Sequence, residues 1–577
     1  MNQMRSTVDP FTIEVIRDSL QALCDEMFAV MRKAAMSPLI YEVLDFGVGV
    51  TDGTGDLACQ GCGIPVFVGA LDQDVKAVIA KHSASNSNPI QTGDIFIGND
   101  PYSGGTHLND VSLMMPILAR GELVGWLANK AHWSDIGGMI PGGLSTRSTS
   151  LFQEGTQFPN IKLFSRGEVI QPVLDLIVAN SRMPERTLGD MWAGVAALRA
   201  GERRFNKLLE QYGTSTVRRA IASILDYGET VTRNAFDSLP RGTFTAEVLM
   251  DDAAEDGSPV PVHAKVEITD TNFIVDLTGN PKQSAAGPFN CSEAMTRIAV
   301  QIAFKALTSP SSPANAGSFR ALKVICEPGT IFAAQRPAAV GLYPEPVIHA
   351  IDLVCKALAP HMPERIGAGC YASVNGTFVS GTNPVTGRFL VTIEPEPGGW
   401  GACASADGES AQFSPINGET YNIPVEVNEA LYGYRVNRLE LNDHSSGHGK
   451  FRGGKGIILE YVNQSKDATI GAIYTRSRYG AWGMAGGGEG STNYVEVVRK
   501  GAVQRFAKAS EIQLEMDDLI RVVTGNGGGY GDPRERPRER VADDLRNGYI
   551  SAADAAEIYG LGEKQFSAAW PALGQGR

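Results

Sequence analysis

Two histidines, each followed three residues later by an aspartate, are the side chains of this sequence best suited to chemistry. His107 and Asp110 form one pair, and His132 and Asp135 form the other. Both pairs lie in or beside glycine-rich turns, where backbones approach closely and side chains can converge. Imidazole nitrogens and carboxylate oxygens suit a borderline divalent ion such as Zn, Fe or Mn. The spacing therefore fits a metal site, two local turn hydrogen bonds, or a mixed arrangement in which a carboxylate orients a ligating histidine.

Other motifs favour structural roles. Cys59 and Cys62 have the spacing of a zinc knuckle, but no second pair of ligands accompanies them, so we expect a turn with two free thiols. The glycine-rich segments 451–456 and 527–533 lack the spacing of a phosphate-binding Walker loop and are expected to form sharp turns. No dinucleotide-binding fingerprint is evident. A reaction that needs ATP would therefore require another subunit to bind it.

Length and composition limit the class of protein. The 577 residues suffice for about three to five packing units, and 43% apolar with 20% charged residues is a globular composition. A net charge of −13 repels nucleic-acid backbones and anionic membranes, so we expect neither as a partner. We expect no signal peptide and no transmembrane helix. A cytoplasmic enzyme or enzyme subunit is the resulting hypothesis.

Hydrophobic periodicity predicts the elements that position these residues. A three-four spacing indicates a helix over 11–35, and short apolar runs between turn residues indicate strands from 43 to 168, with one helix over 71–81. Further helices are expected at 169–180, 186–212, 215–236, 292–308, 346–358, 541–547 and 552–559. Further strands are expected at 244–250, 260–268 and 272–277, which form an antiparallel meander, and at 321–326, 389–393, 435–441, 457–461, 468–474, 494–498 and 518–523.

These elements predict an α+β protein of several domains, with mixed β-sheets, glycine-rich loops, a central helical block and short C-terminal helices. Five segments are expected. They are an N-terminal helix with the metal-site β region (1–168), the helical block (169–240), an α+β region (241–366), a glycine-rich β region (367–533) and a helical tail (534–577).

With these motifs, the chain resembles the hydantoinase B/oxoprolinase family. The family comprises beta-type subunits of ATP-dependent cyclic-amide hydrolases, and related chains occur in biotin-independent ketone carboxylases. The resembling segments run from end to end of the chain. They are the opening helix with Asp9-Pro10, then Tyr41–Phe46, Gly98–Asp110, His132–Gly138, Gln153–Gly155, Gly399–Gly408, Gly447–Gly456, Gly527–Pro533 and Ala556–Gly560.

The resemblance implies a metal centre. In the carboxylase branch a histidine, the aspartate three residues later and a second histidine some two dozen residues on hold the ion, and here these are His107, Asp110 and His132. Asp45 is the candidate fourth ligand. Asp100 and Asp135 are expected to orient the imidazoles from behind. Zinc is the expected ion, with manganese or iron as alternatives.

The resemblance also implies an ATP-dependent hydrolysis. A hydantoinase A-type alpha subunit would bind ATP and Mg and phosphorylate the amide oxygen of a cyclic amide, a small molecule such as a lactam or hydantoin. The present chain would supply the metal-assisted hydrolytic site, where Asp135 or Glu154 takes the proton from water. A hetero-oligomer such as α2β2 is expected.

Two alternatives stay open. One is a subunit of an ATP-dependent ketone carboxylase, and the other is a non-catalytic scaffold that shapes the active site of its partner. The sequence also departs from the family at Phe67, where many members carry a histidine after Ile-Pro-Val. If that position lines the substrate pocket, the phenylalanine predicts a preference for a less polar ring.

Overall fold

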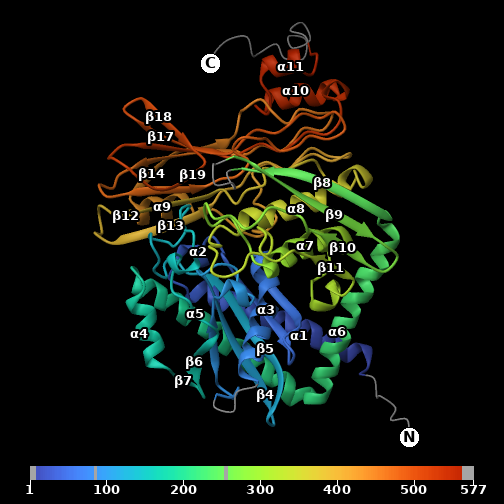
Figure 1. Cartoon of the computed structure of the whole chain (residues 1–577), viewed down its shortest axis with the longest axis vertical. Coiled ribbons are helices and arrows are strands. Elements are labelled where there is room, and N and C mark those ends of the chain that lie inside the picture. Colours follow the sequence, from blue (N-terminus) through green and yellow to red (C-terminus); the bar gives the residue numbers. More distant parts are fainter. Residues whose placement is uncertain (1–7, 84–87, 252–257, 562–577) are drawn as a thin grey trace.

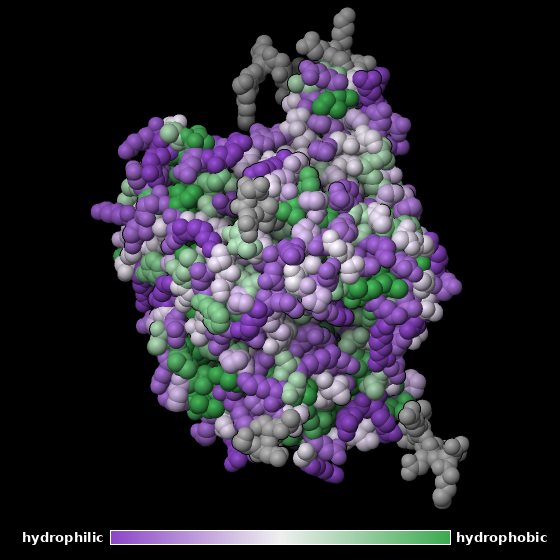
Figure 2. Space-filling view, viewed as in Figure 1, coloured by the Kyte–Doolittle hydropathy of each residue, from purple (hydrophilic) through white to green (hydrophobic). Residues whose placement is uncertain are grey.

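The computed structural model of the chain describes residues 8–83, 88–251 and 258–561. These residues form four β-sheets and a set of helices, which confirms the predicted α+β class with several domains (Figure 1). Hydrophilic side chains prevail on the face shown in Figure 2, where the hydrophobic ones form scattered small groups. Within the described part of the chain, no helix combines the length and the apolar character that crossing a membrane demands.

The first sheet holds the residues that could do chemistry. Its seven strands lie in the order β2-β1-β5-β4-β3-β6-β7, and neighbouring strands pair antiparallel. The strands are β1 (Phe46–Asp52), β2 (Leu57–Gly63), β3 (Ile95–Gly98), β4 (Asp110–Ala119), β5 (Glu122–His132), β6 (Ile161–Ser165) and β7 (Glu168–Val169). The predicted strands of this region are confirmed.

Helices cover both faces of this sheet, so its central strands are buried on both sides. On β4, Leu113 and Met115 belong to a core shared with α1, whereas Met114 between them packs with Leu71 and Val75 of α3. Successive side chains of a strand point to opposite faces, so an uninterrupted apolar run meets two layers of helices. The helices are α1 (Pro10–Ala34) and α3 (Pro65–His82), and the short α2 (Pro38–Tyr41) leads from α1 towards the sheet.

The predicted helical block packs on the same side of the sheet as α1. It consists of α4 (Gln171–Ala179), α5 (Pro184–Tyr212) and α6 (Thr214–Ala235), which agree with the predicted ranges within a few residues. The helices α1 and α5 approach so closely that a Cβ on Gly201 would lie 2.6 Å from Met27 Sδ. One hydrophobic core therefore joins residues of the first two predicted segments.

The next region places two helices against a second, four-stranded sheet. Strands β8 (Gly242–Met250), β9 (Val260–Ile268) and β10 (Phe273–Asp276) form the predicted antiparallel meander, and β11 (Leu322–Ile325) adds to β10 in parallel. The helices are α7 (Glu293–Thr308) and α8 (Pro344–Leu358). The polypeptide just before α8 reaches back to the first sheet, which matters for the site.

Two sheets and many glycine-rich segments form the C-terminal half, at the top of Figure 1. One sheet has the order β13-β12-β16-β19 and the other β14-β15-β20-β17-β18. The strands are β12 (Gly376–Thr382), β13 (Phe389–Pro395), β14 (Tyr434–Leu441), β15 (Ile457–Asn463), β16 (Thr469–Ile473), β17 (Tyr494–Arg499), β18 (Ala502–Phe506), β19 (Lys508–Gln513) and β20 (Leu519–Val523). Helices α9 (Val425–Tyr432), α10 (Arg538–Arg546) and α11 (Ala552–Glu557) complete the fold.

The glycine-rich segments are close-packed backbones. Gly454 donates its N–H to Trp400 O at 2.9 Å and accepts from Gly527 N at 2.9 Å. A Cβ on Gly454 would lie 1.8 Å from Glu409 O, so only glycine allows these chains to approach. Residues 562–577 of the predicted tail lie outside the described residues.

Candidate metal centre

A cavity of about 70 Å³ lies where the N-terminal sheet, the chain before α8 and the sheet of β12 and β13 meet. His107, Asp110, His132, Asp45 and Glu345 supply its ionisable side chains. The other lining residues are mostly apolar, and they are Ile64, Val66, Phe67, Leu144, Gly341, Leu342, Tyr343, Pro344, Val374, Gly376, Ile393, Pro395, Ile416, Asn417 and Ile473. The structure therefore brings four of the residues predicted to bind a metal into one cavity.

Antiparallel pairing brings two of these residues together. Asp110 is the first residue of β4 and His132 the last of β5, and they are direct partners in the ladder. His107 lies three residues before β4. It follows Gly104, whose φ of 103° is in the left-handed region. The three residues each offer one ligand atom, and these atoms lie within 4.8 Å of one another. Three buried donors of mixed nitrogen and oxygen type form a suitable set for a divalent ion.

Hydrogen bonds orient the three side chains. His107 Nε2 lies 2.7 Å from Asp110 Oδ1, and His132 Nδ1 lies 3.0 Å from the same oxygen. The other ring nitrogen of His107, Nδ1, lies 3.2 Å from the carbonyl oxygen of Gly341. A proton on Nδ1 would donate to that carbonyl and leave Nε2 free to bind a metal.

One buried nitrogen atom indicates that these residues suit a metal ion. His132 Nε2 is buried and has no hydrogen-bond partner among the described residues. An unpaired buried polar nitrogen is costly. A metal ion bound to this nitrogen would remove that cost, so the cluster fits the ion that the family resemblance implies.

The charge of Asp110 depends on its neighbours. Burial favours the protonated acid, but the charges and hydrogen bonds of His107 and His132 outweigh burial and hold the pKa of Asp110 well below its usual range. The carboxylate is therefore ionised and available as a ligand. The hydroxyl of Tyr343 donates to its other oxygen at 3.4 Å. Burial, with the charges of Asp110 and Asp45, raises the pKa of Tyr343 well above its usual value, so the phenol keeps its proton.

Asp45 lines the same cavity from the turn before β1. Its carbonyl oxygen accepts from His132 N at 3.1 Å, and its Oδ2 lies 4.0 Å from His132 Nδ1. Burial raises the pKa of Asp45 to about 7, which the charge of His132 opposes and that of Asp110 reinforces. The preceding residue, Leu44, adopts φ 62°, a backbone conformation that is uncommon for leucine.

The structure does not bring Asp135 or Glu154 into the cavity. Asp135 Oδ1 pairs with Arg182 Nη1 at 2.9 Å, and its Oδ2 accepts from Arg182 N at 2.5 Å. Glu154 accepts from Gly341 N at 2.7 Å and Val340 N at 3.1 Å, and burial raises its pKa to about 7. These contacts commit both carboxylates to holding loops. Their predicted role as proton acceptors for a water in the cavity gains no support from this placement.

Asp100 also lies away from the imidazoles. Its carboxylate accepts from Tyr102 N at 3.1 Å, Ser103 Oγ at 2.9 Å and Arg336 Nη2 at 2.7 Å, which stabilises the turn that leads to His107. Both imidazoles instead meet Asp110, and His107 also meets a backbone carbonyl. The predicted role of Asp100 and Asp135 in orienting the imidazoles gains no support from these contacts, because the partners given for both carboxylates lie elsewhere.

Sequence reasoning missed the segment Gly341–Glu345. It supplies the carbonyl that meets His107, the Tyr343 hydroxyl, and Glu345, whose side chain is fully buried. Val374 N donates to Glu345 Oε1 at 3.2 Å, and burial raises the pKa of Glu345 to about 7 against the effect of its hydrogen bonds. The available signal in the sequence was Tyr343 and Glu345 on either side of Pro344, which begins α8. This signal does not predict which distant turn the start of the helix contacts.

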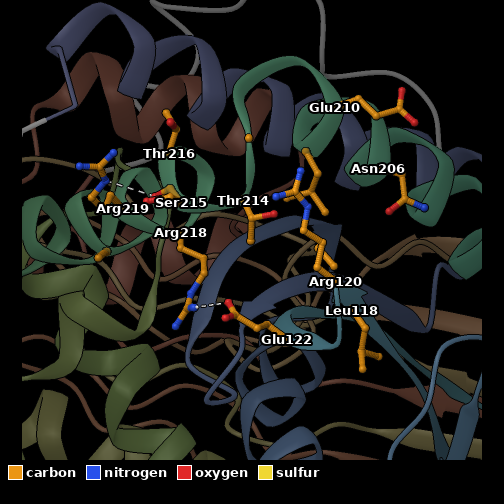
Figure 3. A pocket seen from close by; sticks show the side chains of 14 residues that line it. Leu118, Arg120, Glu122, Asn206, Glu210, Thr214, Ser215, Thr216, Arg218 and Arg219 are labelled. Carbon is orange, nitrogen blue, oxygen red and sulfur yellow. Dashed lines mark hydrogen bonds and ion pairs between the residues drawn. The ribbon is translucent and has the colours of Figure 1, made fainter.

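A larger hollow of the described surface lies elsewhere. It has a volume of about 1170 Å³, between the β4–β5 turn and the corner of α5 and α6 (Figure 3). Two of its arginines have local partners, since Arg218 Nη1 pairs with Glu122 at 3.2 Å and Arg219 Nε donates to Ser215 O at 3.3 Å. No histidine or cysteine is among its described lining residues. The small cavity is therefore the better candidate for chemistry.

Comparison with known proteins places this cavity in a family context. The model of the family described as hydantoinase B/oxoprolinase matches residues 9–533. A putative B-type subunit of a D-/L-hydantoinase from Pseudomonas sp. is 30% identical, over 96% of this chain and 95% of that protein.

Two solved structures are similar over nearly the whole chain. The crystal structure of an ATP-dependent caprolactamase from Pseudomonas jessenii superimposes with a TM-score of 0.90, at 27% identity, over 98% of this chain and 99% of that one. A nucleotide-free acetone carboxylase shares the fold, with a TM-score of 0.89 at 20% identity, over 96% of this chain and 81% of that one.

Proposed function

Since the chain belongs to the hydantoinase B/oxoprolinase family, we propose that it is the beta-type subunit of an ATP-dependent enzyme that hydrolyses a cyclic amide. One observation carries the proposal within the family. His107, Asp110 and His132 converge on a buried cavity whose remaining walls are mostly apolar. Such a cavity is suited to a small organic ring next to a metal ion.

We propose that His107, Asp110 and His132 hold the ion, with zinc as the first candidate and manganese or iron as alternatives. Asp45 is the candidate fourth ligand. Such an ion supplies Lewis acidity, which makes a carbonyl carbon more electrophilic and water more acidic. An unstrained cyclic amide resists hydrolysis because resonance weakens its carbonyl as an electrophile. Activation by ATP on a hydantoinase A-type alpha subunit, which also binds Mg, would remove this protection before the ring reaches the present chain.

The residues of this chain orient the reactants and move protons. If Asp45 does not bind the ion, it can act as a base instead: it lines the cavity and burial raises its pKa to about 7, so near neutral pH a substantial fraction is ionised and can accept a proton from water. Tyr343 keeps its proton and donates a hydrogen bond to Asp110 Oδ2, which helps to hold this carboxylate in place as a ligand. The apolar walls exclude bulk water and so protect an activated ring from reaction outside the site.

Asp135 and Glu154 fit positioning roles. Asp135 holds Arg182 and accepts from Gly142 N at 3.3 Å, near the loop that carries the lining residue Leu144. Glu154 accepts hydrogen bonds from the peptide N–H groups of Val340 and Gly341. The carbonyl oxygen of Gly341 in turn lies 3.2 Å from His107 Nδ1. Glu154 thereby acts on His107 through one peptide unit.

We expect Glu154→Gln to weaken zinc binding. Both oxygens of Glu154 accept from backbone N–H groups, and the amide nitrogen of glutamine would face one of these donors. The loss of orientation at Gly341 should raise the Kd for zinc by about 10–100-fold. A chelator competition titration measures this change, and a thermal melt of the same samples reports any general loss of folding. An unchanged Kd would show that Glu154 does not position His107.

Reconstitution tests the function itself. The purified chain, mixed with its hydantoinase A-type partner, ATP and Mg, should open a cyclic amide to the corresponding amino acid or carbamoyl product. Omission of the chain, the partner or ATP should each abolish product, which chromatography of the reaction mixture measures. Carboxylated ketone as the product, dependent on bicarbonate, would instead establish the carboxylase alternative. Ring opening by the partner alone would establish the scaffold alternative.

A further inference from the structure

Most of the side chains that line the cavity besides the candidate metal ligands are hydrophobic. They include Ile64, Val66 and Phe67 at the start of α3, and Ile393, Ile416 and Ile473 from the C-terminal half. Phe67 keeps only 3% of its surface exposed. Most of the surface that a substrate meets away from the ligands is therefore aliphatic or aromatic.

Apart from the two histidines, the lining side chains of the cavity that can carry a charge near neutral pH are carboxylic acids. Asp45, Asp110 and Glu345 line it, and no lysine or arginine is among the described lining residues. Lys130 lies close behind the ligands, but its Nζ pairs with Asp74 Oδ2 at 3.0 Å and does not reach the cavity. An anionic group on a substrate would meet no cationic side chain there.

We propose that this cavity selects a small cyclic amide that carries no carboxylate or other anionic substituent on its ring, and that Phe67 is a specificity-determining residue. The inference rests on the proposed function, because it assumes that a cyclic amide is the substrate. It deepens that function by choosing between neutral rings and ring carboxylic acids.

Size supports the same substrate class. The cavity has a volume of about 70 Å³, and about 10–15 Å³ accommodates one water molecule, so the space takes roughly five to seven water-sized groups. That is the size of one five- or six-membered lactam ring. An extra substituent would press against the walls of Phe67 and the three isoleucines.

Desolvation sets the direction of selection. The methylene groups of a neutral ring gain by leaving water for the apolar walls. A ring carboxylate that points away from the metal ligands would lose its hydration, meet no cationic side chain, and lie in a cavity that already holds the carboxyl groups of Asp45 and Glu345. The carbonyl, or a phosphate attached to it by the partner, is oriented toward the metal ligands and is not subject to this penalty.

A matched pair of lactams tests the proposal. 2-Pyrrolidinone and 5-oxoproline share one ring and differ only in a carboxylate, and each is titrated into the full zinc-loaded chain by ligand-observed NMR without ATP or partner. We expect the neutral lactam to bind at least about tenfold more tightly, a difference of about 1.4 kcal/mol. Equal affinity, tighter binding of the acid, or binding of neither compound would overturn the inference.

Variants of Phe67 test its role. Phe67→Arg places a cation at the wall and should lower the ratio of affinities for the neutral lactam over the acid to near one, whereas the matched apolar variant Phe67→Leu should keep the wild-type ratio. Phe67→His, a smaller polar change, should lower the ratio in part and serves if the arginine variant fails to fold by circular dichroism. An unchanged ratio in a folded Phe67→Arg or Phe67→His protein would exclude Phe67 as the determinant.

The proposed selection of neutral rings and the proposed hydrolysis can be contradicted independently of each other. If the binding ratio is as expected but the reconstituted enzyme opens neither lactam, the selection stands and the proposed hydrolysis is wrong. If the enzyme opens both lactams at equal kcat/KM and binds both equally, the hydrolysis stands and the selection is wrong.

Discussion

Purified His132→Ala protein is expected to contain almost no transition metal, whereas the wild-type chain should carry about one equivalent, as measured by plasma mass spectrometry. His132 is one of three residues whose ligand atoms lie within 4.8 Å of one another, and its Nε2 has no partner among the described residues. Removing one imidazole leaves His107, Asp110 and the candidate ligand Asp45, a set with a single nitrogen donor. We expect this set to bind zinc too weakly to retain it through purification.

The same substitution should lower ATP-dependent ring opening by the reconstituted enzyme at least about 100-fold. His263→Ala is the matched control, because His263 lies on β9 outside the cavity and its Nε2 meets Thr278 O at 3.1 Å. That control should keep its metal and its turnover. Wild-type metal content in His132→Ala would refute the proposed ligand set. Loss of metal with undiminished turnover would instead move catalysis to the partner and support the scaffold alternative.

Glu345→Gln should change how stability depends on pH. Burial raises the pKa of Glu345 from 4.5 to about 7, although Thr475 Oγ1, Val374 N and Ser373 Oγ all donate to it. The folded state therefore binds a proton more tightly than the unfolded state. The contribution of Glu345 to stability is fully present below pH 4.5 and declines as the pH rises toward 7. The total loss corresponds to about 3 kcal/mol, an order-of-magnitude figure.

Glutamine keeps the shape of this side chain but does not ionise. The free energy of unfolding of Glu345→Gln, measured by urea titration at about pH 5 and about pH 8, should fall less between these values than that of the wild type. The variant should gain on the wild type by up to about 3 kcal/mol at the higher pH. Glu364→Gln, at an exposed position, controls for the loss of one charge. Parallel pH profiles of wild type and Glu345→Gln would contradict the raised pKa.

Local patterns in the sequence predicted most of the elements. The apolar spacing of residues 11–35 and 186–212 matches α1 and α5, and the period-two alternation of 244–268 matches β8 and β9. Elements with weaker patterns were missed. β12 is rich in glycine, serine and threonine and forms a strand because β13 and β16 pair with its two edges. α9 has eight residues, too short for a clear helical period.

The histidine and aspartate spacing pointed to two pairs, His107 with Asp110 and His132 with Asp135, because these residues lie in or beside turns that the sequence marks with glycine. Family resemblance then selected His107, Asp110 and His132 as ligands and added Asp45. The pairing of β4 with β5 and of β1 with β5 then brings all four to one end of the sheet. Strand pairing is a regular geometry, so residues at adjoining strand ends meet even when they are far apart in the chain.

Tertiary structure alone decided which other carboxylates face the cavity. Asp135 and Glu154 are close in sequence to the ligands but bind Arg182 and the N–H groups of Val340 and Gly341. Glu345 is far from Asp110 in the chain and lines the same cavity. The sequence by itself determined the family, the types of most elements and, through the family resemblance, four candidate ligands. The roles of the remaining acids depend on contacts between distant segments, and a buried carboxylate points to whichever distant donor satisfies it.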